Sequence, residues 1–138
     1  MKQIFVYGTL RTGMYNYDKY LKPHHTFQSY GYVKGSLHTL KEKKYPALIP
    51  GSQMILGEIH QIPDELQPEI DLLESYYGEN NPKNEYNKIL CSIYNSQGTQ
   101  IARLPVYFYN LNNPENKAAL GAPIACNDYV TYMLTERS

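Results

Sequence analysis

The stretch KQIFVYGTLRTG, residues 2–13, leads from an apolar segment into a loop that contains two glycines. Residues 2–7 alternate and then become continuously apolar, which is typical of a buried first strand. Gly8 and Gly13 flank the polar residues of the loop, and a short helix is expected over 16–21, with Asn16 as a cap candidate. The chain therefore begins with a strand, a glycine-bearing turn and the start of a helix.

Beyond this stretch the sequence predicts further strands and one amphipathic helix. Leu66, Ile70, Leu73 and Tyr77 recur at spacings that place them on one face of a helix ending at Gly78. A bent strand or two short strands are expected over 27–40, an extended edge over 45–51 and a strand over 54–62. Two more strands, over 86–94 and 99–109, are joined by a hairpin turn at 95–98. A terminal helix is expected over 128–136, capped by Asn127 or Asp128. The intervening segment with Pro114, Gly121 and Pro123 is expected to be loop-like.

This order of elements predicts an α+β domain built on a mostly antiparallel sheet, closed into a small β-barrel with a few flanking helices. The length of 138 residues suits a single domain over 1–138. The sequence indicates no particular oligomeric state.

The bulk composition favours a small-molecule partner. Thirteen basic and thirteen acidic residues cancel, so nothing favours nucleic acid or a membrane surface. No apolar run resembles a signal or spanning segment, and a cytoplasmic location is expected. Cys91 and Cys126 are far apart and the four histidines lack ligand-like spacing, so no metal or cofactor is expected.

The loop after the first strand has a chemical interpretation as well as a structural one. A chain that leaves a buried strand through glycine can turn its main-chain N–H groups toward one point, where they would bind a carboxylate or an oxyanion. The loop lacks the Gly-Lys-Ser/Thr ending of a phosphate-binding loop and the three glycines of a dinucleotide site. On local chemistry alone, a plain structural turn is the favoured interpretation.

Several motifs in order resemble the gamma-glutamyl cyclotransferase-like family, which includes gamma-glutamylamine cyclotransferases and the butirosin-pathway deprotecting enzyme. The resemblance covers most of the chain and is weakest after Asn110. The motifs are Tyr7-Gly8-Thr9-Leu10-Arg11 with Gly13 and Asn16, Gly35 with Leu37, Tyr45-Pro46-Ala47, Gly57-Glu58-Ile59, Ile70-Asp71-Leu72-Leu73-Glu74, and Tyr86.

The resemblance implies a small α+β barrel with a central cavity and an intramolecular acyl transfer. The α-amine of a γ-glutamyl amine or peptide attacks its own γ-carbonyl, and 5-oxoproline and an amine are released. Glu74 falls on the family's catalytic position as general base. An α-amine titrates near about 8, so a base must take its proton before it can attack.

A carboxylate performs this task only if burial raises its pKa. At about 100° per residue, Glu74 sits at one edge of the apolar helix face and Glu69 at the other. The main-chain N–H groups of Gly8, Thr9 and Leu10 are candidates to hold the α-carboxylate or the oxyanion. Candidate wall residues of the substrate site are Tyr7, Tyr45, Tyr86 and Tyr107, each of which also suits ordinary packing.

The chain departs from the family pattern at two places. Lys88 stands where the family usually has arginine, which puts a supporting hydrogen-bond network in question because lysine lacks the planar fork. Cys126-Asn127-Asp128-Tyr129 replaces a more usual small-Gly-Asp-aromatic run. Two other functions stay open: a binding or regulatory module that keeps the cavity without the chemistry, and a tyrosine-stacking nucleic-acid binder, which lacks a basic face.

Overall fold

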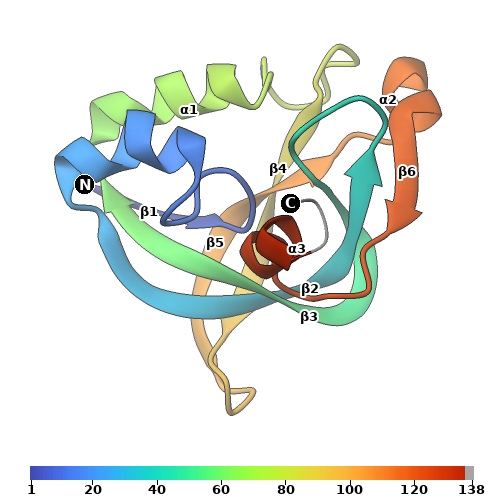
Figure 1. Ribbon diagram of the computed structural model, residues 1–138. Helices are drawn as coiled ribbons and strands as arrows, with labels where there is room; N and C mark the ends of the chain where they lie inside the picture. The colour runs from blue at the N-terminus through green and yellow to red at the C-terminus, as the bar shows by residue number, and fades with distance from the viewer. Residues whose placement is uncertain (136–138) are drawn as a thin grey trace.

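The computed structural model describes residues 1–135 and shows a strongly curved antiparallel sheet with three short helices at its margins (Figure 1). The strands are β1 (Lys2–Val6), β2 (Phe27–Leu40), β3 (Ala47–Ile62), β4 (Tyr86–Tyr94), β5 (Gln100–Tyr109) and β6 (Leu120–Pro123). The helices are α1 (Gln67–Leu73), α2 (Pro114–Ala119) and α3 (Tyr129–Thr135), with single turns of π-helix over Tyr17–Leu21 and of 3-10 helix over Lys22–His24 and Asp64–Leu66. The prediction of a mostly antiparallel α+β fold is confirmed.

The sheet does not close, so the prediction of a β-barrel is wrong. Its strand order is β1-β3-β2-β4-β5, with β6 paired to β2. Within residues 1–135, β1 and β5 form no ladder, and β2 meets β4 through the single pair Tyr32 and Tyr94. Just beyond the end of β1, the Tyr7 hydroxyl donates to the main-chain oxygen of Tyr107 in β5 at 2.5 Å. This single contact does not extend the ladder, and the sheet stays open between its end strands.

The long strand β2 is one bent strand, the first of the two arrangements that its interior glycines left open. Its pairing with β3 shifts register between Phe27 and Ser29 and again between Gly35 and Ser36. A Cβ atom at Gly35 would lie 2.6 Å from a methyl carbon of Leu48, so any other residue there would require the Leu48 side chain to shift. The bends let β2 and β3 sweep together around the core (Figure 1).

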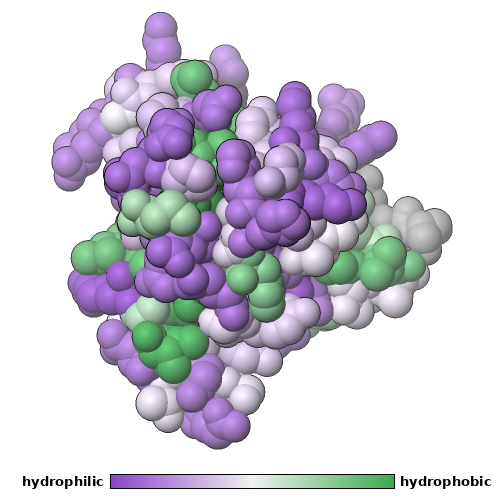
Figure 2. Space-filling model, turned by 90° about the vertical axis from the view of Figure 1, so that its left-hand side faces the viewer, coloured by the Kyte–Doolittle hydropathy of each residue, from purple (hydrophilic) through white to green (hydrophobic). Residues whose placement is uncertain are grey.

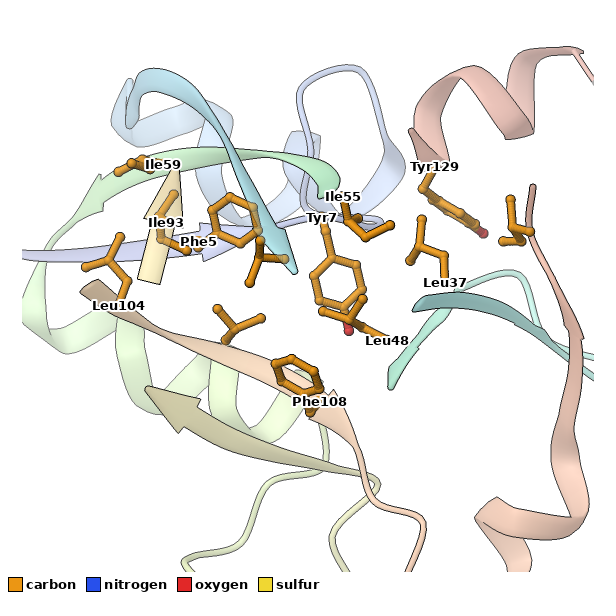
Figure 3. Close-up of a cluster of buried hydrophobic side chains, with 13 residues drawn as sticks. Phe5, Tyr7, Leu37, Leu48, Ile55, Ile59, Ile93, Leu104, Phe108 and Tyr129 are labelled. Atoms are coloured by element: carbon orange, nitrogen blue, oxygen red, sulfur yellow. The ribbon is translucent and has the colours of Figure 1, made fainter. Parts of the chain in front are cut away.

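β1 is buried on both faces and separates two apolar clusters. Phe5 and Tyr7 point into one cluster and Ile4 and Val6 into the other. Figure 3 shows the ring of Tyr7 within the first cluster, near Leu48. Burial of apolar area on both faces favours this short strand by about 25 cal/mol per Å² removed from water. The chain that leaves β1 consequently emerges from the interior.

Two expectations, the end of the amphipathic helix and the loop-like tail, need correction. α1 ends at Leu73, so Tyr77 lies outside it and is 55% exposed, whereas Leu66 and Ile70 are buried. The helix stops there because Ser75 adopts a left-handed conformation with φ 51°. The tail expected to be loop-like forms α2 and β6, because Asn113 caps α2 by accepting from the main-chain N–H of Glu115 and Asn116.

The terminal helix is confirmed within the described residues and is capped by Asp128. The Asp128 carboxylate accepts from the main-chain N–H of Val130 at 3.0 Å and from that of Thr131 at 3.3 Å. The expected end at Glu136 lies outside the described residues.

The surface drawn in Figure 2 is largely hydrophilic, and its hydrophobic residues form separate patches. Among residues 1–135, no helix is long and apolar enough to cross a membrane.

Gly57→Ala is expected to lower the free energy of unfolding by about 1–3 kcal/mol. An added Cβ would lie 2.3 Å from the ring of Phe5 and 2.4 Å from the main-chain oxygen of Val6, and the main chain of β1 cannot move aside. Urea unfolding would measure the change, with Ser52→Ala on the exposed part of β3 as the control. Equal stability of the two variants would contradict the close approach of β1 and β3.

Candidate active site

A cavity of about 330 Å³ opens beside the end of β1. It is bounded by the loop after β1, the end of α1 and the start of β4, with one tyrosine from β5. The structure brings together all eight residues that the sequence singled out: Tyr7, Gly8, Thr9, Leu10, Tyr45, Glu74, Tyr86 and Tyr107. Their roles stay predictions. Eight other residues line the cavity that the sequence did not single out for it: Phe5, Val6, Tyr15, Asn16, Pro46, Leu73, Ser75 and Glu85.

The loop after β1 presents main-chain donors to this cavity. It turns at Gly8, whose oxygen accepts from the main-chain N–H of Arg11 at 3.0 Å. Within residues 1–135 the N–H groups of Gly8, Thr9 and Leu10 have no hydrogen-bond partner, although all three residues are buried. Buried main-chain donors are nearly always paired, so these three are suited to a ligand with an anionic oxygen.

Asn16 supports the loop and does not cap a helix. No cap hydrogen bond forms from its side chain, and the helical turn that follows is π-helical. Its Nδ2 instead donates to the Thr9 hydroxyl at 2.8 Å, while the Thr9 main-chain oxygen accepts from the N–H of Tyr17 at 3.1 Å. The expectation of a capping role is wrong because the side chain turns back toward the loop.

Glu74 is the first residue beyond α1, and it lines the cavity at the point where the helix ends. Its main-chain N–H still donates to the oxygen of Ile70 at 3.0 Å, and the left-handed Ser75 then redirects the chain. The side chain is half-buried, and among the described residues its carboxylate has no hydrogen-bond donor. Glu69, the other carboxylate considered, is exposed.

The environment of Glu74 raises its pKa to about 8. Burial is the main cause, and the negative charges of Glu85 and Asp71 add to it. No hydrogen bond stabilises the ionised form. A carboxyl group of this kind exchanges a proton near neutral pH, which is the property required of a general base.

The tyrosines of the wall are held by their hydroxyl groups. Tyr7 donates to the main-chain oxygen of Tyr107, and Tyr86 donates to that of Pro46. Burial raises the pKa of Tyr7 and of Tyr86 well above the ordinary value, so both hydroxyls stay protonated. Tyr45 is half-buried and donates to Glu85 Oε2 at 2.7 Å.

Lys88 supplies a supporting contact at the position where the family usually has arginine. Its Nζ lies 3.2 Å from Asp71 Oδ2 and 5.0 Å from the centre of the Tyr76 ring. The other oxygen of Asp71 accepts from the Tyr107 hydroxyl at 2.5 Å and from Gln67 Nε2 at 3.0 Å. Asp71 therefore links α1 to β4 through Lys88 and to β5 through Tyr107. A lysine at position 88 is sufficient for the link to β4.

Glu85 is the charged group of the cavity that sequence reasoning missed. Lys43 Nζ lies 2.8 Å from its Oε2, the same atom that receives the Tyr45 hydroxyl. Lys43 and Glu85 are 42 residues apart, so no local periodicity signals the pair. The position of Glu85 next to Tyr86 was the one sequence feature that could have indicated its place in the cavity.

A half-buried carboxyl group and three free main-chain donors thus line one cavity of an α+β fold, an arrangement suited to a small polar molecule. The sequence model described as "Gamma-glutamyl cyclotransferase, AIG2-like" matches residues 4–131. The chain belongs to this family.

Two sequence relatives agree with the assignment, and one solved structure shares the fold. The chain is 35% identical over 107 residues to a gamma-L-glutamyl-butirosin B gamma-glutamyl cyclotransferase from Niallia circulans, over 78% of this chain and 67% of that protein. It is 31% identical over 77 residues to a putative gamma-glutamylcyclotransferase from Vibrio cholerae, over 51% of this chain and 60% of that protein. The fold is shared with an AIG2-like protein from Mus musculus, at a TM-score of 0.65, 23% identity, and coverage of 86% and 84% of the two chains.

Glu74→Gln is expected to change how stability depends on pH. Since the folded-state pKa is raised from 4.5 to about 8, the protonated carboxyl contributes stability that is full below about pH 4.5 and is lost as pH rises through about 8. The melting temperature of Glu74→Gln should therefore fall less between about pH 4.5 and about pH 8 than that of the native protein. Glu69→Gln is the control, and parallel curves for all three proteins would contradict the raised pKa.

Proposed function

We propose that this protein is a gamma-glutamyl cyclotransferase that releases 5-oxoproline from a γ-glutamyl amine or peptide, with Glu74 as general base. The observation that carries the proposal is the apposition in one cavity of a carboxyl group of raised pKa and three unpaired main-chain donors. Family membership and the names of two relatives support the same activity.

The reaction balances with the groups present. The carboxylate of Glu74 takes a proton from the substrate's α-ammonium group, and the freed nitrogen lone pair attacks the γ-carbonyl carbon. The new bond closes a five-membered ring and places negative charge on the carbonyl oxygen. The bond to the leaving nitrogen then breaks as Glu74 returns the proton to that nitrogen. The ring nitrogen, which still carries an extra proton, gives it up by way of Glu74 to the departing amine, so that 5-oxoproline and a protonated amine leave and Glu74 is again a carboxylate.

The pKa of the base suits this exchange. An α-amino group titrates near about 8, and the pKa of Glu74 is raised to about 8, so the proton moves between groups of similar affinity. An ordinary exposed glutamate would take the proton far less readily. The closed ring forms within one molecule, and positioning by the cavity supplies a further advantage of several kcal/mol, about 7 or more in well-oriented cases.

The donors of Gly8, Thr9 and Leu10 hold an anionic oxygen of the substrate. That oxygen belongs either to the α-carboxylate, which is charged throughout, or to the carbonyl, which becomes charged in the transition state. In both cases the walls of Tyr7, Tyr86 and Tyr107 exclude water and strengthen the contact.

The direct experiment incubates the protein with a panel of γ-glutamyl amines and peptides and detects 5-oxoproline by mass spectrometry. Glu74→Gln should fold normally and reduce kcat by about 100-fold or more, because it cannot accept the proton. Glu69→Gln, on the exposed side of α1, should retain native activity. Normal turnover by Glu74→Gln would refute its assignment, and a panel compound that raises Tm but is never converted would favour a binding module.

Glu85→Gln is expected to move the acid limb of the kcat-against-pH profile to lower pH. The negative charge of Glu85 contributes to the raised pKa of Glu74, so its removal favours ionisation of the base. Loss of the partner of Lys43 acts in the same direction, because it leaves a positive charge near the cavity. Glu79→Gln, in the exposed loop beyond α1, is the control, and a limb that stays in place in both variants would contradict the coupling.

A further inference from the structure

A second glutamate, Glu58 on β3, lies outside the cavity and is enclosed by hydrogen-bond donors. Its side chain is 1% exposed. Oε1 accepts from the main-chain N–H of Thr12 at 3.0 Å and from the Thr12 hydroxyl at 2.8 Å, and Oε2 accepts from Arg11 Nε at 3.1 Å. Nε2 of the fully buried His60 lies 2.9 Å from Oε1. Each oxygen thus meets donors from the loop after β1.

The Glu58 carboxylate is ionised despite its burial. Burial alone would raise its pKa, but the contacts with His60, Thr12 and Arg11 outweigh burial and lower the pKa to about 2. A buried charge is tolerated only where such partners surround it. Removal of the charge would therefore leave several buried donors without an acceptor.

These donors belong to the loop that lines the cavity. Arg11 and Thr12 directly follow Leu10, and the N–H of Arg11 is bonded to the oxygen of Gly8. The loop is therefore held at its start by the buried strand β1 and at residues 11 and 12 by Glu58. Residues 8–10 span the interval between the two anchors, and their N–H groups have no partner of their own among the described residues.

Two further contacts make the second anchor rigid. Nη1 of Arg11 donates to the carboxylate of Asp128 at the start of α3. On the other side, Nδ1 of His60 lies 2.8 Å from the hydroxyl of Thr26, which precedes β2. Glu58 is consequently the point at which the loop is fastened to β3, to α3 and to the start of β2.

We propose that Glu58 is a positioning residue for the cyclotransferase reaction: it holds residues 11 and 12 so that the N–H groups of Gly8, Thr9 and Leu10 face the substrate. This inference rests on the proposed function for its kinetic consequence. Glu58 itself lines no part of the cavity, so its effect on the reaction passes through the loop. An error of about 1 Å in such donors costs on the order of 100-fold in rate.

Glu58→Gln tests the proposal with little change in shape. The new amide NH₂ would face the donors of Arg11 and Thr12, so the contact becomes repulsive. We expect kcat/KM to fall by about 10- to 100-fold, while the acid limb of the kcat profile, which Glu74 sets, keeps its position. Ile93→Val, at a buried residue that does not line the cavity, is the control for a loss of stability alone. Native kcat/KM in Glu58→Gln, or an equal loss in Ile93→Val, would overturn the proposal.

Hydrogen exchange tests the same proposal without any substrate. The amide of Thr12 should exchange at least about tenfold faster in Glu58→Gln, because its carboxylate acceptor is lost. The amide of Arg11 should also exchange faster, because the turn that pairs it with the Gly8 oxygen is no longer held, while amides of β4 and β5 keep their native rates. If the native protein releases no 5-oxoproline, the proposed function fails, and this measurement still decides whether Glu58 holds the loop. Unchanged exchange at both amides would refute that role.

A milder pair of variants covers the case in which Glu58→Gln does not fold. Thr12 is exposed, and its hydroxyl donates to Glu58. Thr12→Val removes this donor at constant shape and should lower kcat/KM several-fold with little change in Tm, whereas Thr12→Ser retains the hydroxyl and should restore the native value. Native kcat/KM in both variants would count against the proposal.

Discussion

β1 carries apolar side chains on both faces, and its end is therefore buried rather than free to enter solvent. The chain must turn within the molecule, and every main-chain N–H in that turn needs a partner. The N–H of Arg11 donates to the oxygen of Gly8 and the N–H of Thr12 to the Glu58 carboxylate, whereas the three preceding residues line the cavity with N–H groups that have no partner among the described residues. The burial of one short strand thus produces both a fastened loop and a set of donors that a substrate can use.

Two glutamates near this loop have opposite surroundings and different proposed roles. Glu58 is ringed by donors and stays ionised, while Glu74 has apolar and negatively charged neighbours and holds its proton to about pH 8. Burial alone would raise the pKa of both carboxyl groups, and hydrogen bonds reverse this effect at Glu58 but not at Glu74. In the proposed reaction the first carboxylate fixes geometry and the second moves a proton. The network of Asp71, Tyr107 and Lys88 ties the end of α1 to the sheet and so keeps Glu74 opposite the loop.

Local patterns in the sequence predicted β1, the bent β2 and the β4–β5 hairpin, because alternation and turn residues act over a few positions. The approach of Glu74 to the loop followed from the family resemblance, since helix periodicity alone did not separate it from Glu69. Properties that join distant segments escaped prediction. Barrel closure depends on whether β1 and β5 pair, the Lys43–Glu85 contact spans 42 residues, and α2 begins at a proline that also suits a loop.

The contact between Arg11 and Asp128 joins positions 117 residues apart. Arg11 is 5% exposed, so loss of the Asp128 carboxylate would leave Glu58 as the remaining counter-charge of its buried guanidinium. Glu58 already contacts Thr12 and His60. The start of α3 is consequently tied to the loop after β1, and a substitution at position 128 would be felt at position 11.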